Sequence, residues 1–189
     1  MGAPRGGEPA PDAADEIAAA WQRERPGTPT ESIGIVTRLW RLAKLFGEDR
    51  RRVLLDSGVD SATLDLLSVL RRGSPPYSLT TRELAGLTLV TAGAISQRVA
   101  RAEREGLVER HTEPGSRSVH VTLTPAGHAL VEQTVDRVLT RELELVSGLD
   151  ADQRAHLASL LRALLGHVQA RCDDHGVSHV GDNDLGPAL

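Results

Sequence analysis

Residues 107–127 read Leu-Val-Glu-Arg-His-Thr-Glu-Pro-Gly-Ser-Arg-Ser-Val-His-Val-Thr-Leu-Thr-Pro-Ala-Gly, and this stretch decides the fold. Residues 107–111 and 118–123 alternate apolar and polar side chains, and Pro114-Gly115 lies in the segment between them. Alternation on both sides of a Pro-Gly turn is typical of a β-hairpin. Thr124-Pro125 is a helix start, with a capping hydroxyl followed by proline at the first position. The sequence therefore predicts a hairpin that leads directly into a long helix.

Two short helices are expected just before this hairpin. Thr80-Thr81-Arg82-Glu83 has the spacing of a capping box and opens a helix to about Leu87. Thr91 opens a second helix, which ends before Gly106 and turns Ile95, Val99 and Ala102 inward. Two short helices followed by a hairpin predict a winged helix-turn-helix unit. We call residues 60–123 the reading head.

Longer helices are expected on both sides of the reading head. On its N-terminal side they cover about residues 13–25 and a segment from a Thr28 cap to Asp56, with Val36, Trp40 and Leu54 as buried candidates. On its C-terminal side they cover about 124–146 and 150–171. Aromatic residues make up only 2% of the chain, so the core must be aliphatic, which suits packed helices. Residues 1–12 are predicted to be disordered and residues 173–189 to be a loose tail.

Charge and cysteine content restrict the class of protein. The net charge is −4, yet residues 71–117 hold eight arginines against five glutamates. A phosphate backbone would find its counter-charges in this middle segment. Cys172 is the only cysteine, so an intrachain disulfide is excluded. With no apolar run that could span a bilayer and no signal-peptide pattern, we expect a cytoplasmic protein.

The second short helix has the composition of a helix that enters the major groove. Its start, Thr91-Ala-Gly-Ala-Ile-Ser-Gln97, is rich in small residues, which let the backbone approach DNA closely. Ser96 and Gln97 could bond base edges, and Arg101 lies one turn further on. Hydroxyls and free N–H groups at the start of the first helix could hold phosphates, and the hairpin tip could enter the minor groove. The candidate DNA contacts are Thr80, Thr81, Thr91, Ser96, Gln97, Arg101, Arg110 and Arg117.

The stretch 107–111 together with 117–127 resembles the wing and dimerisation helix of the MarR family, and the resemblance covers about residues 30–165. Gly115 stands where that family usually carries an aspartate. The resemblance implies a mainly α protein with a small β-hairpin wing and a domain over residues 13–172. Helices at about 13–56 and 124–171 would form a homodimer that binds a near-palindromic operator. It also implies a repressor that a ligand releases.

The segment Trp21-Gln-Arg-Glu-Arg-Pro26 is similar to the urate-responsive, PecS-like and HucR-like branch of the family. That similarity implies an effector site made of Trp21, Asp65, Arg72 and Arg98. Seven residues return to the same helix face, so Asp65 and Arg72 should point the same way. A planar purine anion could stack on an indole and accept hydrogen bonds from guanidinium groups. The ordinary alternatives are a packing tryptophan, a structural ion pair and a phosphate-binding arginine.

Other functions remain open from the sequence. The effector could be a phenolic compound or another small carboxylate, and the chain could be a helical interaction module that never binds DNA. A redox sensor would need Cys172, and a metal sensor could use His167, Cys172, His175 and His179, whose spacing fits no tight metal site. The sequence has no phosphate-binding glycine loop, nucleophile elbow or His-Glu-x-x-His motif, so no enzyme, cofactor or metal is predicted.

Overall fold

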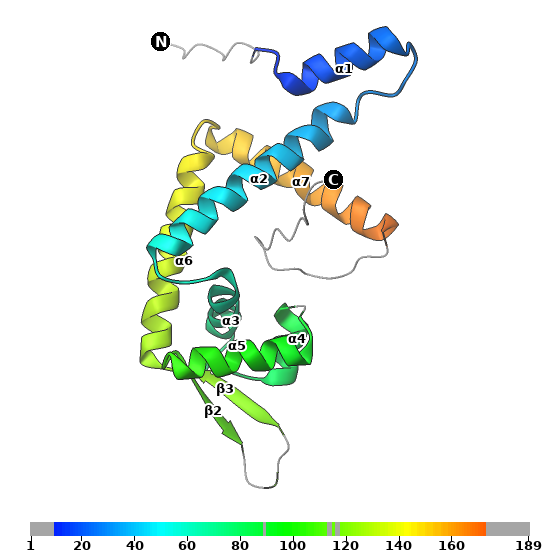
Figure 1. The fold of residues 1–189 in the computed structure, drawn as a ribbon. Helices are drawn as coiled ribbons and strands as arrows, with labels where there is room; N and C mark the ends of the chain where they lie inside the picture. The colour runs from blue at the N-terminus through cyan, green and yellow to red at the C-terminus, as the bar shows by residue number, and fades with distance from the viewer. Residues whose placement is uncertain (1–9, 89, 113–114, 116–117, 173–189) are drawn as a thin grey trace. The chain divides into compact units, whose positions relative to one another are not determined.

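The structure is a computed structural model that describes residues 10–88, 90–112, 115 and 118–172. Arg117, His175 and His179 therefore lie outside the described residues. The elements follow in the order α1 (Ala13–Glu24), α2 (Ile33–Asp56), α3 (Ser61–Arg72), β1 (Ser78–Thr80), α4 (Thr81–Thr88), α5 (Ala92–Arg104), β2 (Val108–Thr112), β3 (Val119–Leu123), α6 (Pro125–Leu145) and α7 (Ala151–Arg171) (Figure 1). The chain divides into two compact units, residues 1–48 and 49–189.

The first unit contains α1 and the first part of α2. Asp12, the last residue of the segment predicted to be disordered, caps α1 and accepts a hydrogen bond from the Ala14 N–H at 2.8 Å. Arg38 on α2 pairs with Asp12 at 3.0 Å and with Asp15 at 2.7 Å. The hydrogen bonds from Arg38 and from the Ala14 N–H lower the pKa of Asp12 to about 2. Polar contacts thus hold α1 to α2.

The helix start predicted at Thr28 is wrong, because α2 begins at Ile33. The side-chain amide of Gln22 donates to the Thr28 carbonyl at 2.6 Å and to the Thr30 hydroxyl at 2.9 Å. These groups serve the connection from α1 and are not the cap of a helix. Two of the predicted buried side chains of α2 are also exposed in the single chain, Val36 to 42% and Trp40 to 71%.

The core of the second unit lies around α3. Asp60 caps this helix as predicted, accepting a hydrogen bond from the Thr63 N–H at 2.7 Å. The leucines of α3 pack against aliphatic side chains of α4, α5, β2, β3 and α6. Its fully buried members are Leu64, Leu66, Leu67, Leu70, Leu84, Ile95, Val99, Val108, Val121 and Val131.

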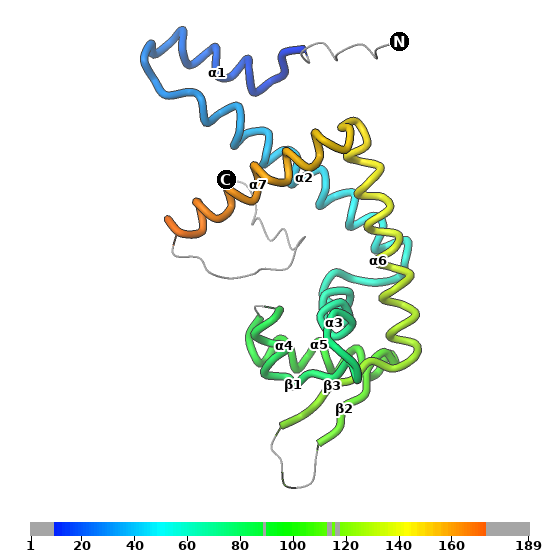
Figure 2. The backbone as a smooth tube through the Cα atoms, turned by 180° about the vertical axis from the view of Figure 1, so that it is seen from behind, coloured from blue at the N-terminus to red at the C-terminus, as the bar shows by residue number. Residues whose placement is uncertain are grey.

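A three-stranded antiparallel sheet, in the order β1-β3-β2, contacts α4 and α5 (Figure 2). The predicted hairpin is confirmed as β2 and β3, in which His111 faces His120. Gly115 in its connection has φ +83°, a left-handed conformation that favours glycine. Strand β1 was not predicted, and it pairs with β3 so that Thr80 lies opposite His120.

The start of α6 is joined to the backbone between α5 and β2. The Thr124 N–H donates to the Leu107 carbonyl at 3.1 Å, and its hydroxyl donates to the Gly106 carbonyl at 2.7 Å. A Cβ atom added to Gly127 would lie 2.0 Å from the Leu107 carbonyl oxygen, so glycine is required for this approach. The backbone that follows α5 is therefore bonded directly to the start of α6.

Charged side chains connect α2 and α6 within the second unit. Arg141 donates to both oxygens of Asp49, at 2.9 and 3.2 Å, and Arg50 pairs with Glu142 at 2.9 Å. The Asp49 side chain is only 13% exposed. The hydrogen bonds from Arg141 hold the pKa of Asp49 below its ordinary value.

Helix α7 buries none of its residues in the described part of the chain. Its apolar side chains are 37–58% exposed, namely Leu157, Leu160, Leu161, Leu164, Leu165 and Val168. No helix among the described residues is long and apolar enough to cross a membrane.

Candidate nucleic-acid interface and effector site

The start of α4 forms the predicted capping box. The Glu83 N–H donates to the Thr80 hydroxyl at 3.2 Å, and the Thr80 N–H donates to the Glu83 carboxylate at 2.8 Å. The Thr80 hydroxyl also donates to that carboxylate, at 2.8 Å. These two donors lower the pKa of Glu83. The cap that orders α4 thus uses the Thr80 donors and puts a carboxylate at the predicted phosphate position, while Thr81 is the first residue of the helix.

Helix α5 presents its polar side to solvent. Thr91 caps it, accepting from the Ala94 N–H at 3.2 Å, and its inward side chains Ile95, Val99 and Ala102 are 1% exposed, as predicted. The Ser96 hydroxyl donates to the Ala92 carbonyl at 2.8 Å. Because the Ser96 hydroxyl proton is used in this bond, Ser96 can still accept a hydrogen bond from DNA but cannot donate one without breaking the bond to Ala92.

Gln97 and Arg104 are among the exposed side chains of α5 that can reach DNA. Gln97 was a predicted contact, and Arg104 was not predicted. It lies seven residues beyond Gln97, so the two share a helix face. That spacing is visible in the sequence and could have identified Arg104. Arg82, in the first turn of α4, is also exposed and was also missed.

Carboxylates hold two of the predicted DNA-binding arginines. Arg101 pairs with Asp60 and donates to Glu105 at 2.9 Å. Arg110 on β2 donates from Nε to the Glu103 carboxylate of α5 at 2.8 Å. The hydrogen bonds that these carboxylates accept raise the pKa of each guanidinium. The third predicted arginine, Arg117, lies outside the described residues.

The four predicted effector residues are divided between the two units. Trp21 belongs to the first unit and is 46% exposed. Asp65, in the second unit, is 3% exposed among the leucines of α3. Arg72 ends the same helix, is exposed, and donates to the Ser68 carbonyl at 3.2 Å, whereas Arg98 on α5 is half-buried. Asp65 and Arg72 therefore differ in exposure, although the sequence places them on one helix face.

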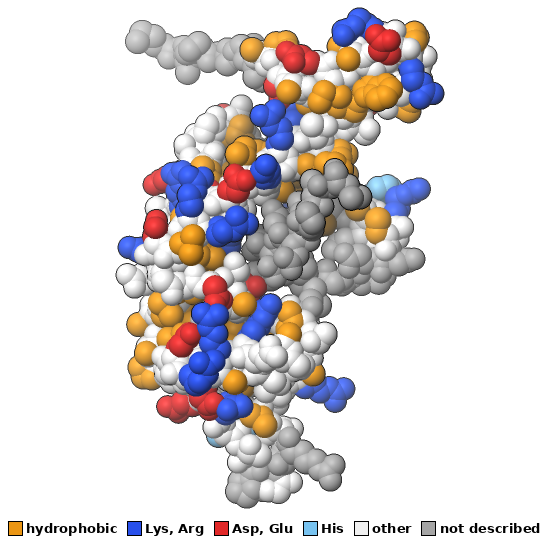
Figure 3. Space-filling model, viewed as in Figure 1, with side chains coloured by type: hydrophobic (Ala, Val, Ile, Leu, Met, Phe, Trp, Pro, Cys, Tyr) orange, Lys and Arg blue, Asp and Glu red, His pale blue; other side chains and the backbone are white. Residues whose placement is uncertain are grey.

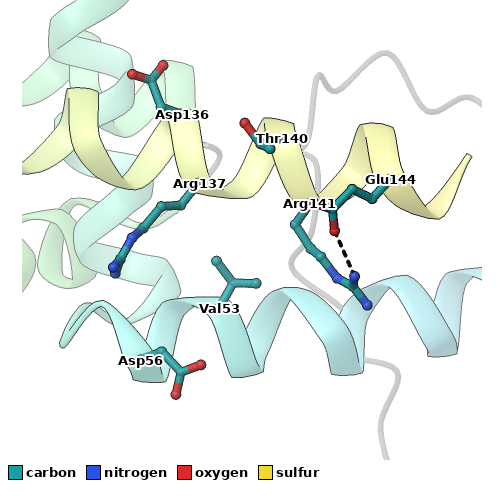
Figure 4. A pocket seen from close by; sticks show the side chains of 7 residues that line it. All are labelled: Val53, Asp56, Asp136, Arg137, Thr140, Arg141 and Glu144. Atoms are coloured by element: carbon teal, nitrogen blue, oxygen red, sulfur yellow. Dashed lines mark hydrogen bonds and ion pairs between the residues drawn. The ribbon is translucent and has the colours of Figure 1, made fainter. Parts of the chain in front are cut away.

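A cavity of about 440 Å³ lies between α2 and α6 of the second unit. Figure 4 shows Arg137 and Arg141 extending from α6 toward α2, on either side of Val53. Its other lining residues are Asp56, Asp136, Thr140 and Glu144. None of the four predicted effector residues lines it. This cavity was not predicted, because its walls come from helices far apart in the chain.

The histidine and cysteine residues form no metal-holding group in the described ranges. Groups of three or more His, Cys, Asp or Glu with suitable placement are absent there. Cys172 is an exposed free thiol, while His175 and His179 lie outside those ranges. His111 and His120 stack across β2 and β3, with ring centroids 5.4 Å apart.

Two short helices, the second with an exposed polar face, and a sheet with a hairpin wing define a winged helix-turn-helix protein. The sequence model of the MarR family matches residues 57–117. The transcriptional regulator PecS of Dickeya dadantii is 27% identical over 155 residues, which cover 82% of this chain and 91% of that protein. The oxidised form of MarR from E. coli is 30% identical, with a TM-score of 0.57, over 69% of this chain and 93% of that one.

A third relative is BpsR of Bordetella bronchiseptica, whose DNA binding is regulated by 6-hydroxynicotinic acid. It is 25% identical, with a TM-score of 0.57, over 68% of this chain and 97% of that one. The chain belongs to the MarR family. It is a DNA-binding transcriptional regulator and not an enzyme. Family membership favours this function over that of an interaction module without DNA binding.

Proposed function

We propose that this regulator is a homodimeric repressor that binds a near-palindromic operator and is released by a small planar anion, urate or a related purine. The observation that carries DNA binding is the exposed polar face of α5 directly beside the hairpin wing. Gln97 on that face contacts base edges, and Arg82 in the first turn of α4 and the start of α5 lie against phosphates. Arg117, which lies outside the described residues, is the proposed contact to the minor groove.

The exposed apolar face of α7 supports a dimer. Six large apolar side chains on one helix are a contiguous hydrophobic surface, which soluble monomers seldom leave exposed. A second copy of the chain would bury them. A twofold dimer then presents two recognition helices to successive major grooves of a symmetric operator.

The effector proposal rests on residue chemistry and on the resemblance to the urate-responsive branch. Arg72 and Arg98 supply guanidinium groups for a planar anion, and Asp65 accepts a ring N–H. Arg98 lies on α5, the recognition helix, so a ligand that draws it inward alters the DNA-binding surface. Release follows if the ligand binds the DNA-incompetent state better.

A gel-shift titration on the DNA upstream of the regulator's own gene, with and without urate, tests the proposal. Operator binding that weakens as salt rises and is lost on adding urate supports it. Binding that ignores urate removes the purine effector and leaves the repressor. If no duplex is bound in a salt-dependent way, operator binding itself is refuted.

The variant Arg72→Ala tests the effector site. It should bind the operator as the wild type does but no longer respond to urate, because a guanidinium that contacts the anion is removed. Arg72→Lys keeps the positive charge and loses the planar pair of donors, so it should respond only at higher urate concentrations. A normal response in Arg72→Ala would refute the site, whatever the operator affinity.

An aromatic carboxylate is the second candidate effector. The similarity to BpsR, whose DNA binding is regulated by 6-hydroxynicotinic acid, favours it. The same titration with 6-hydroxynicotinic acid in place of urate decides between the two classes.

A further inference from the structure

We infer that Glu103 withholds Arg110 from the DNA phosphate backbone and so sets how tightly this regulator holds DNA of any sequence. The inference rests on the proposed operator binding. It identifies a residue that limits this binding through a contact inside the reading head.

The pair joins the recognition helix to the wing. Glu103 lies in the last turn of α5, and Arg110 is in the middle of β2. Arg110 donates from Nε to Glu103 Oε2 at 2.8 Å, and its Nη2 lies against the same oxygen. The Arg110 guanidinium is thus engaged by one carboxylate within the surface expected to meet DNA.

The pair is open enough to be exchanged. The side chains of Arg110 and Glu103 are 43% and 34% exposed, so water and an incoming anion can reach both. Ion pairs with this exposure contribute little to folding. The hydrogen bond from Arg110 lowers the pKa of Glu103, so the carboxylate is charged at neutral pH. A phosphate oxygen must therefore displace Glu103 and then remain close to its negative charge.

The same arrangement recurs on the recognition helix. Arg101 is engaged by Asp60 and Glu105. On the face drawn in Figure 3, basic and acidic side chains of the second unit accordingly lie beside one another. A withheld arginine weakens sequence-independent binding, which depends on phosphate contacts. Because non-operator DNA is in vast excess in a cell, this restraint leaves more regulator free for its operator.

The variant Glu103→Gln tests the inference, with Glu109→Gln as the matched control. Glu109 is on β2 next to Arg110 in the chain and is exposed, and its side chain forms no ion pair within the described ranges. Both variants remove one negative charge close in the chain to Arg110, but only Glu103→Gln frees an arginine. Each is titrated against operator and unrelated duplexes by fluorescence anisotropy over a series of salt concentrations, and thermal unfolding confirms that each is folded.

We expect Glu103→Gln to bind both duplexes several-fold more tightly at low salt, with a plot of log affinity against log salt steeper by about 0.9, one additional phosphate contact. The gain should disappear in Glu103→Gln/Arg110→Ala. Glu109→Gln should show a smaller gain that persists when Arg110→Ala is added.

Equal effects of Glu103→Gln and Glu109→Gln would overturn the inference, since charge alone would then explain both. Weaker operator binding by folded Glu103→Gln would also overturn the inference. The ion pair between Glu103 and Arg110 would then serve to position the wing for DNA binding. Both outcomes presuppose wild-type operator binding. Its absence would instead refute the proposed function.

Discussion

Gly127 occupies a position where no other residue fits. Its missing side chain allows the first turn of α6 to meet the Leu107 carbonyl, which a Cβ atom would approach to 2.0 Å. We expect Gly127→Ala to lower the free energy of unfolding by about 1–3 kcal/mol, the usual range for overpacking. Urea denaturation followed by circular dichroism measures this loss.

Gly166, in the middle of α7, is the control for that substitution. Nothing lies within 4 Å of a Cβ atom built there, and alanine favours a helix over glycine by up to about 1 kcal/mol. Gly166→Ala should therefore be as stable as the wild type or more stable. If Gly127→Ala matched it, the close approach at Leu107 would be disproved.

At the scale of single residues, local signals were predictable and distant partners were not. Thr91 and Asp150 cap helices because a side-chain oxygen meets an N–H three residues on, and that spacing is visible in the sequence. The pairing of Arg110 with Glu103 depends on how β2 packs beside α5, which no local pattern encodes. The burial of Asp65 likewise follows from the packing around α3.

The proposed operator binding assigns two kinds of DNA contact to one face of α5. Gln97→Ala should reduce discrimination between operator and unrelated DNA by about 1–3 kcal/mol, because a base-edge contact is lost. Arg104→Ala should weaken binding to all sequences alike and reduce the salt dependence by about one phosphate contact. Anisotropy titrations on both duplexes separate these outcomes. A sequence-dependent effect of Arg104→Ala would contradict its assignment to phosphate.

The contact between α2 and α6 should make stability depend on pH. The pKa of Asp49 is lowered in the folded chain, so its contribution is complete above the ordinary value of 3.8 and is lost as the pH falls through the folded value. We expect the wild type to lose thermal stability below about pH 4 more steeply than Asp49→Asn, which has no carboxylate to titrate. Melting temperatures measured from pH 2 to 7 give this loss of stability for both proteins. If the two melting temperatures fell in parallel, the ion pair would be excluded as the cause of the pH dependence.

Elements were predictable where their pattern was long or their cap was local. The hairpin and α3 to α7 follow the alternation and capping signals of the sequence closely. The start of α2 was misplaced because Gln22 engages Thr28 and Thr30 from the preceding helix. Strand β1 was missed because three residues carry no readable alternation, and it exists only through its pairing with β3.

At the scale of the whole molecule, the proposed dimer predicts a clear effect of one charge on α7. Leu161→Glu would place a carboxylate in the apolar interface, whereas Ser159→Glu adds the same charge to the other side of the helix. We expect Leu161→Glu to be monomeric in light-scattering chromatography and to lose operator binding. Ser159→Glu should remain dimeric. A dimeric Leu161→Glu would show that α7 is not the interface.

The exposed apolar surface of α7 also has a consequence for the stability of the protein at the concentrations found in a cell. A helix that finds its apolar partners only on a second molecule is stabilised by mass action, so its melting temperature rises with protein concentration. Dilution of the protein then lowers its stability. A cell that makes few copies of this regulator would hold a larger fraction of them as unfolded, protease-sensitive monomers. The concentration of the protein would thereby control the amount of folded dimer that can bind the operator, independently of any effector.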